Sequence, residues 1–141
     1  MNFTISELLH SDTANKLGIV NTTSDKVVLD NMFYLICECL QPIRDKLGKP
    51  MKVTSGYRCP ILNKAVGGST TSQHAKGQAV DFIVNGMSVQ DIVQFIRSNG
   101  FKFDQLIEEH GAGGSWVHIS YVHGFNRQEV LRFYNNKYTH I

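Results

Sequence analysis

The sequence predicts an α+β fold, in which an antiparallel sheet carries a polar site and helices pack on the other face of that sheet. Apolar residues recur at helical spacing between residues 26 and 47. Two apolar segments rich in β-branched residues, 79–84 and 116–121, are typical of strands. Each of these strands contains one residue of a type that binds metals, so we expect the sheet to carry the site.

Length and composition are those of one globular domain, which we expect to extend over residues 1–141 and to be monomeric. Hydrophobic residues make up 42% of the chain and charged residues 18%, which provides for an apolar core. The net charge of +2 is too small to indicate nucleic-acid binding. No apolar run is long enough to span a membrane, and the first residues lack the basic and apolar segments of a signal peptide.

The three cysteines, Cys37, Cys39 and Cys59, cannot all pair with one another, and their spacing is not that of a disulfide framework. Cys37 and Cys39 lie two positions apart on an expected helix and therefore point in different directions. We expect them to be small core residues rather than zinc ligands.

The elements are assigned from the spacing of apolar residues and from helix caps and breakers. Helices are expected over 6–17, 26–47, 88–98 and 126–134, and strands over 51–55, 79–84, 103–109 and 116–121. Ser6 is in position to cap the first helix, which Gly18 would end. Pro42 is expected to kink or restart the second helix. Ser88 and Asp91 resemble a capping box at the start of the third.

Two loops connect these elements near the candidate site. Residues 56–68 are expected to form a loop with a helical turn at 61–63. The Gly-rich segment 110–115 joins the last two strands, which we expect to form a hairpin.

The segment around Asp81 has the features of half a metal site. His74 offers an imidazole nitrogen and Asp81 a carboxylate oxygen, and both are zinc ligand types. Asp81 is the only charged residue of the strand over 79–84, where a carboxylate is costly unless it is paired. Gly77 is expected where the backbone bends or approaches another group closely. By itself the spacing also fits a surface histidine and a salt-bridged aspartate.

A third ligand is predicted in the later strand. Alternation along 116–121 puts Trp116, His118 and Ser120 on one face. His118 alone could be a core histidine that donates to a backbone carbonyl. With His74 and Asp81 it completes the three-ligand set of a catalytic zinc site, in which a fourth position is left for water. We therefore predict one bound Zn²⁺.

Together these residues resemble the zinc D-Ala-D-Ala carboxypeptidase family of peptidoglycan peptidases, in its small single-domain branch with phage endolysin relatives. The motifs that carry the resemblance are Ser72-x-His74-x-x-Gly77-x-Ala79-x-Asp81, Trp116-Val117-His118 and Ser55-Gly56-Tyr57-Arg58. The resemblance covers nearly the whole chain. It implies a hedgehog/DD-peptidase-like fold and a zinc metallopeptidase that hydrolyses a peptide bond in peptidoglycan stem peptides. Without a signal peptide, such a protein would reach the cell wall by phage-type release.

The resemblance also implies roles for the residues around the ligands. Arg58, whose planar guanidinium can hold a carboxylate with two hydrogen bonds, would bind the substrate or stabilise the developing oxyanion. Ser72, Gln73 and Trp116 would join it in substrate binding: the first two orient the ligand loop, and Trp116 forms the floor of the cleft. A structural salt bridge for Arg58 and simple packing for Trp116 are the alternatives.

The general base is where this chain departs from many relatives. They have an acidic residue three positions before the last histidine ligand, where this chain has Ser115. The small branch instead has a glutamate at the end of the preceding strand, which matches Glu109, with Glu108 as the alternative. Adjacent strand residues point to opposite faces, so the hairpin register decides. Pairing of Glu109 opposite Trp116 puts Glu109 on the face of His118, and a slip of one residue puts Glu108 there.

Two functions stay open on the sequence. One is the enzyme, as a D-Ala-D-Ala carboxypeptidase or a stem-peptide endopeptidase. The other is a zinc-stabilised, non-catalytic module that binds cell-wall peptide or a protein partner, because a fold does not fix an activity. Among the remaining histidines, His110 is expected nearest to the site because it follows Glu109.

Overall fold

The structure is a computed structural model that describes residues 1–141. Its centre is a mixed sheet of six strands in the order β1-β2-β4-β3-β5-β6. The strands are β1 (Lys52–Ser55), β2 (Ala79–Ile83), β3 (Gln105–Gly111), β4 (Gly114–Ser120), β5 (Glu129–Tyr134) and β6 (Lys137–His140). The α+β class is confirmed, and so is the β3–β4 hairpin. The sheet is not wholly antiparallel as expected, because β3 and β5 pair in parallel.

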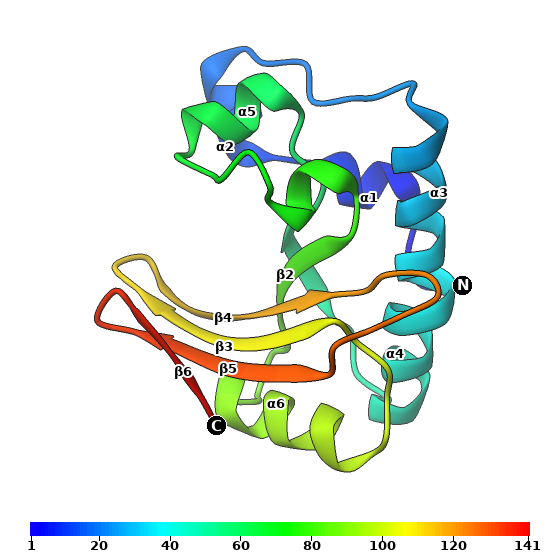
Figure 1. The fold of residues 1–141 in the computed structure, drawn as a ribbon, viewed down its shortest axis with the longest axis vertical. Coiled ribbons are helices and arrows are strands. Elements are labelled where there is room, and N and C mark those ends of the chain that lie inside the picture. Colours follow the sequence, from blue (N-terminus) through cyan, green and yellow to red (C-terminus); the bar gives the residue numbers. More distant parts are fainter.

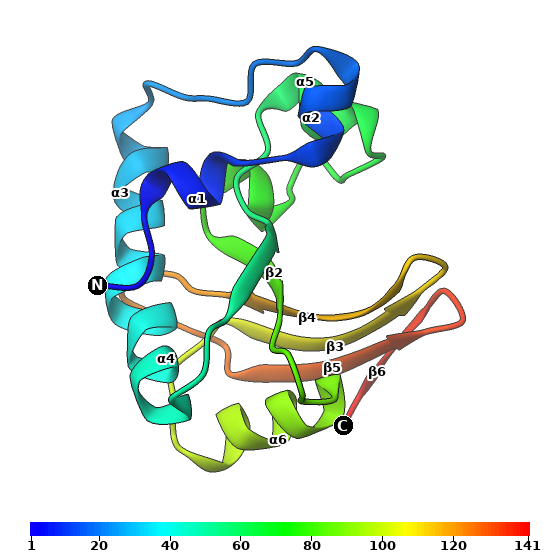
Figure 2. The ribbon, with the colours of Figure 1, turned by 180° about the vertical axis from the view of Figure 1, so that it is seen from behind.

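Helices surround this sheet (Figure 1). They are α1 (Ile5–Leu9), α2 (Asp12–Leu17), α3 (Lys26–Tyr34), α4 (Gln41–Leu47), α5 (Pro60–Ala65), α6 (Val89–Ser98), the π-helix η1 (Leu35–Leu40) and the 3₁₀ turn η2 (Gln73–Lys76). In Figure 1, α6 lies below the sheet and α5 above it. Figure 2, from behind, shows α1 beside α3. None of these helices has both the length and the apolar character that crossing a membrane requires.

The central strands have one apolar face and one polar face. The apolar face is formed by residues that pair across β2, β4 and β3 and are fully buried: Val80, Phe82, Val117, Ile119 and Leu106. They belong to the core cluster that includes residues of α3, η1, α4 and α6. Asp81 and His118 alternate with them along β2 and β4 and point to the other face. The helices α3, α4 and α6 and the π-helix η1 thus pack on the face opposite the polar site, as predicted.

The helix expected over 6–17 is two helices. Ser11 breaks it, because its hydroxyl accepts a hydrogen bond from the backbone N–H of Ala14 at 3.1 Å and so caps α2. Thr4, not Ser6, caps α1 in the same way. The helical turn expected at 61–63, inside the loop over 56–68, is also longer than predicted and forms α5.

The helix expected over 26–47 forms, but its middle third is the π-helix η1. Pro42 lies in the first turn of α4, directly after η1. Proline has no N–H group, and its ring crowds the carbonyl four residues earlier, so a regular α-helical ladder cannot run through it. A π-helical stretch shifts the hydrogen bonding by one residue and lets the helix continue. The expected restart at Pro42 takes this form.

The three cysteines are free thiols. Cys39 and Cys59 are buried in the core cluster, and Cys37 packs against it while partly exposed. Cys37 and Cys39 are thus core residues, as predicted, and Cys59 is one as well.

The helix expected over 126–134 is wrong. This segment forms β5 and continues through Asn135 and Asn136 into β6. Asn135 and Asn136 have φ angles of 51° and 58°, in the left-handed region. Two consecutive residues of this conformation make a turn whose twist suits a β-hairpin, and asparagine adopts it more readily than most residues. The Asn-Asn pair was therefore the local signal for a hairpin.

Gly77 provides a test of how η2 is seated on α3. Its φ is 74°, and a Cβ atom placed on it would lie 2.7 Å from the carbonyl oxygen of Val28, so the close approach expected at this glycine is confirmed. We expect Gly77→Ala to lower the free energy of unfolding by about 2–3 kcal/mol, because the left-handed conformation costs about 1–2 kcal/mol and the clash adds to it.

Gly86→Ala is the matched control. Gly86 has a φ of 82°, but a Cβ atom placed on it would meet nothing within 4 Å, so only the conformational cost of about 1–2 kcal/mol is expected. Urea denaturation of both variants measures the difference. Equal losses would show that the close contact between η2 and α3 does not affect the free energy of unfolding.

Candidate metal centre

Three side chains converge on the polar face of the sheet. His74 lies on η2, Asp81 on β2 and His118 on β4, and Asp81 pairs directly opposite His118. One ligand atom from each lies within 4.8 Å of those of the other two, so the three residues could hold one metal ion. The structure therefore brings together all three residues that the sequence predicted as ligands.

The neighbours of each imidazole decide which nitrogen it turns to the centre. His74 Nδ1 lies 2.8 Å from the carbonyl oxygen of Gly56, and because a carbonyl only accepts, Nδ1 carries the proton. His74 Nε2 then lies 3.3 Å from Asp81 Oδ1, and His118 Nδ1 lies 3.1 Å from the same oxygen. A neutral His74 would turn the lone pair of Nε2 to the lone pairs of a carboxylate, so either a second proton, which makes the imidazole a charged donor, or a metal ion must lie between them. A cation between them removes this repulsion, so the donor set fits a metal ion.

The surroundings of Asp81 keep it ionised. It is 8% exposed, and burial alone would raise its pKa. Hydrogen bonds and charge from His118 and His74 outweigh burial and hold the pKa of Asp81 well below its usual range. Arg58 Nη2 lies 3.7 Å from Oδ2, which leaves Oδ1 to face the two imidazoles. A cation site requires a carboxylate that is ionised in this way.

Glu109 lies on the same face as the three candidate ligands. It pairs directly opposite Trp116, which is two residues before His118 on β4. Burial raises the pKa of Glu109, and the negative charge of Asp81 also raises it. Together these two effects outweigh His118 and Arg58, which lower it, so the pKa stays above its usual range. A carboxylate shifted in this direction is better suited to accept a proton near neutral pH.

Glu108, His110 and Ser115 lie on the opposite face of the hairpin. The Glu108 side chain is 2% exposed, and its carboxylate lies 2.8 Å from His110 Nε2 and accepts a hydrogen bond from Arg132 Nη2 at 3.2 Å. Ser115 Oγ lies 2.8 Å from His110 Nδ1. The expectation that His110 lies near the site is wrong, because strand alternation turns it away. Ser115 points away for the same reason, so an acidic side chain at this position would not lie on the polar face.

A cleft of about 580 Å³ opens over the three candidate ligands and Glu109. Its lining includes every site residue predicted from the sequence, namely Arg58, Ser72, Gln73, His74, Asp81, Glu109, Trp116 and His118. It also includes Gln105, Arg127 and Tyr138, which sequence reasoning missed. Arg127 and Tyr138 both come after β4 in the chain. A helix was wrongly expected there, over 126–134, so no strand register could be assigned.

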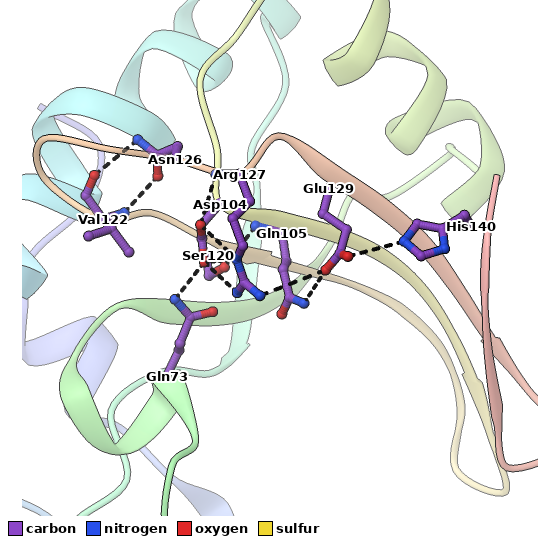
Figure 3. Close-up of polar contacts among 9 residues, drawn as sticks. All are labelled: Gln73, Asp104, Gln105, Ser120, Val122, Asn126, Arg127, Glu129 and His140. Atoms are coloured by element: carbon purple, nitrogen blue, oxygen red, sulfur yellow. Dashed lines mark hydrogen bonds and ion pairs between the residues drawn. The ribbon is translucent and has the colours of Figure 1, made fainter.

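Ser72 caps the turn that carries His74, and Gln73 is the first residue of that turn. The hydroxyl of Ser72 caps η2 by accepting a hydrogen bond from the backbone N–H of His74 at 3.2 Å. Gln73 Nε2 donates to Asp104 Oδ2 at 3.0 Å (Figure 3). These contacts are of the orienting kind predicted for both residues; that either binds substrate stays a prediction.

Asp104 anchors a network that ties the ligand turn to the far side of the cleft (Figure 3). This buried carboxylate accepts hydrogen bonds from Gln73, from the backbone N–H of Arg127 and from its guanidinium, whose Nη2 lies 2.6 Å from Oδ2. Arg127 follows β4 in the chain, and Asp104 directly precedes β3. The network therefore joins η2, β3 and the segment after β4 at one buried point.

The charge of Asp104 makes this network sensitive to acid. Burial alone would raise the pKa of Asp104, but hydrogen bonds from Arg127 and Gln73 outweigh burial and lower it. The unfolded chain then binds this proton more readily, so the stabilisation is present above about pH 4 and is lost as the pH falls through the lower folded pKa. We expect Asp104→Asn to cost about 2 kcal/mol near neutral pH, and the deficit to shrink below about pH 3.

Thermal unfolding followed by circular dichroism across this range measures the deficit. Asp91→Asn, at an exposed carboxylate in the first turn of α6, is the control and should cost less than about 1 kcal/mol at any pH, the size of an exposed helix-dipole interaction. A deficit in Asp104→Asn that does not vary with pH would show that the carboxylate charge is not its source.

Two comparisons with known proteins bear on this site. Residues 1–120, which include all three candidate ligands, match the family model described as Peptidase M15. Over 103 residues, 72% of the chain, the sequence is 30% identical to the zinc D-Ala-D-Ala carboxypeptidase of Streptomyces albus G. The chain spans 38% of the length of that relative. The resemblance drawn from the sequence motifs is confirmed, and the chain belongs to the Peptidase M15 family.

Proposed function

We propose that this protein is a zinc metallopeptidase that hydrolyses a peptide bond in bacterial peptidoglycan. The observation that carries the proposal is the convergence of His74, Asp81 and His118 in one cleft with the carboxylate of Glu109. Membership of the Peptidase M15 family supports the reaction class. The name of the Streptomyces albus G relative supports zinc as the metal and cell-wall peptide as the substrate.

In this proposal His74, Asp81 and His118 hold one Zn²⁺ and leave a position open for water. Bound zinc lowers the pKa of its water to about 7 and polarises the carbonyl of the peptide bond. Glu109 acts as the general base: it accepts the proton of the attacking water and passes it to the leaving amine. Its raised pKa, due first to burial, suits both steps.

Arg58 and Trp116 bind the substrate in this proposal. The Arg58 side chain is 20% exposed and lies at the second oxygen of Asp81, so its remaining donors can reach a substrate carboxylate or the carbonyl oxygen as negative charge develops on it. Trp116 lines the cleft beside Glu109 and offers a flat surface for the peptide. The alternative of a non-catalytic module rests on Ser115, and it loses support because Ser115 lies on the other face of the hairpin.

Mass spectrometry of muropeptides from digested peptidoglycan tests the function. Loss of a terminal D-alanine would identify a carboxypeptidase, and cleavage within the stem peptide or its crossbridge would identify an endopeptidase. In either case we expect the products to disappear after zinc is removed by a chelator and to return when zinc is restored. Products that are the same with and without the protein would contradict the proposal.

The ligand assignment predicts the metal content of a variant. We expect His118→Ala to lose most of its zinc, because two remaining ligands hold the ion far more weakly than three. His10→Ala removes an exposed histidine on the amino-terminal side of α2 and should keep one zinc per chain. Elemental analysis of the purified variants measures both. Wild-type zinc content in His118→Ala would exclude this ligand set.

The base assignment predicts a loss of turnover without a loss of metal. Glu109→Gln keeps the shape of the side chain and removes its proton acceptor, so we expect kcat to fall about 10²-fold or more with zinc still bound.

Glu108→Gln is the matched control for this variant. It should lower the melting temperature, because a buried carboxylate loses its charge-assisted bonds to His110 and Arg132, and it should leave kcat nearly unchanged. Steady-state kinetics on a defined stem peptide compare the two. Normal turnover by Glu109→Gln together with an inactive Glu108→Gln would refute the assignment.

A further inference from the structure

We infer that Tyr138 binds the substrate several residues away from the cleaved bond, so that the protein acts on extended stem peptides in preference to a free dipeptide. This inference rests on the proposed function and specifies the substrate of the same cleft. It concerns the carboxy-terminal hairpin, β5 and β6, which lies beyond the residues matched by the family model.

Cross-strand pairing aligns Tyr138 with the predicted base. Trp116 on β4 pairs with Glu109 on β3, Glu109 pairs with Phe133 on β5, and Phe133 pairs with Tyr138 on β6. Residues that pair directly across a sheet point to the same face. The four residues therefore form one row on the metal face, with aromatic rings on both sides of the carboxylate.

Tyr138 is held in place on one side and open to the cleft on the other. Its ring packs on that of Phe133, with 4.6 Å between the ring centroids, and the residue remains 55% exposed. It lines the same cleft as the three candidate ligands. Burial raises the pKa of Tyr138, and the negative charges of Glu109 and Asp81 raise it further.

The strand spacing converts this row into a length of peptide. Tyr138 lies three strands away from Trp116, a distance of up to about 14 Å along the sheet at about 4.8 Å per strand. An extended peptide advances about 3.3 Å per residue, so a substrate that reaches from Trp116 to Tyr138 spans about four residues. A dipeptide is too short to occupy both ends. Contacts made far from the reacting bond then favour the longer substrate.

The test compares Tyr138→Ala with Tyr134→Ala. Tyr134 belongs to the same hairpin and is 59% exposed, but it directly follows Phe133 on β5, so alternation turns it to the opposite face, where it lines a different pocket with His110. On a tetrapeptide that ends in D-alanyl-D-alanine, the last four residues of the stem pentapeptide, we expect Tyr138→Ala to lower kcat/KM about tenfold, mainly through KM, as for loss of an aromatic anchor. Activity on D-alanyl-D-alanine and zinc content should stay as in the wild type, and Tyr134→Ala should match the wild type in zinc content and in the kinetics on both substrates.

A binding measurement separates this inference from the proposed function. Calorimetry of zinc-loaded Glu109→Gln protein with the same tetrapeptide should show about tenfold weaker binding when Tyr138→Ala is added. If the wild type cleaves no peptidoglycan but this difference is measured, the proposed function fails and the assignment of Tyr138 stands. If the wild type cleaves peptidoglycan but Tyr138→Ala changes neither kcat/KM nor binding, the assignment fails. It also fails if Tyr134→Ala causes the same loss, or if the dipeptide and the tetrapeptide are affected equally. Absence of tetrapeptide binding to the Glu109→Gln protein would overturn both.

Discussion

The site depends on one strand pairing, that of β2 with β4. Antiparallel pairing sets Asp81 directly opposite His118, where the Cβ atoms of paired residues are about 5 Å apart and short side chains can meet. A slip of one residue would turn one of these side chains into the core and an apolar one into the cleft. The buried residues on the other face, such as Val80 and Ile119, hold the register. The strand register that packs the core therefore also sets the geometry of the candidate metal centre.

The same alternation explains why the candidate ligands on β2 and β4 could be found from the sequence. Asp81 is the one charge in an apolar strand, and His118 interrupts another, so each marked a position where burial needed a compensating partner. The proposed general base could not be chosen in this way. Glu108 and Glu109 are chemically alike, and the Gly-rich loop after them does not fix a register. The choice is made by tertiary packing, which buries Glu108 against His110 and Arg132 and leaves Glu109 beside the centre.

The carboxy-terminal hairpin could not be predicted for a different reason. Val130, Leu131 and Tyr134 fit a helical spacing as well as a strand, and the decision is made by the parallel pairing of β5 with β3. Such pairing joins segments far apart in the chain and leaves no local pattern in the sequence. Arg127 and Tyr138 were missed for that reason, although the Asn-Asn turn between β5 and β6 was visible.

The hydrogen bond from His74 to the carbonyl of Gly56 links the metal centre to the amino-terminal helix. Gly56 sits so close to α1 that a Cβ atom would collide with the carbonyl of Leu8, and the next residue, Tyr57, donates its N–H to that carbonyl at 2.8 Å. The docking of α1 thus fixes the acceptor that orients a ligand. By thermodynamic reciprocity, the free energy by which docked α1 strengthens metal binding equals the free energy by which bound metal stabilises α1 against local opening. Amide hydrogen exchange in the first ten residues would then report on occupancy of a site that none of those residues touches.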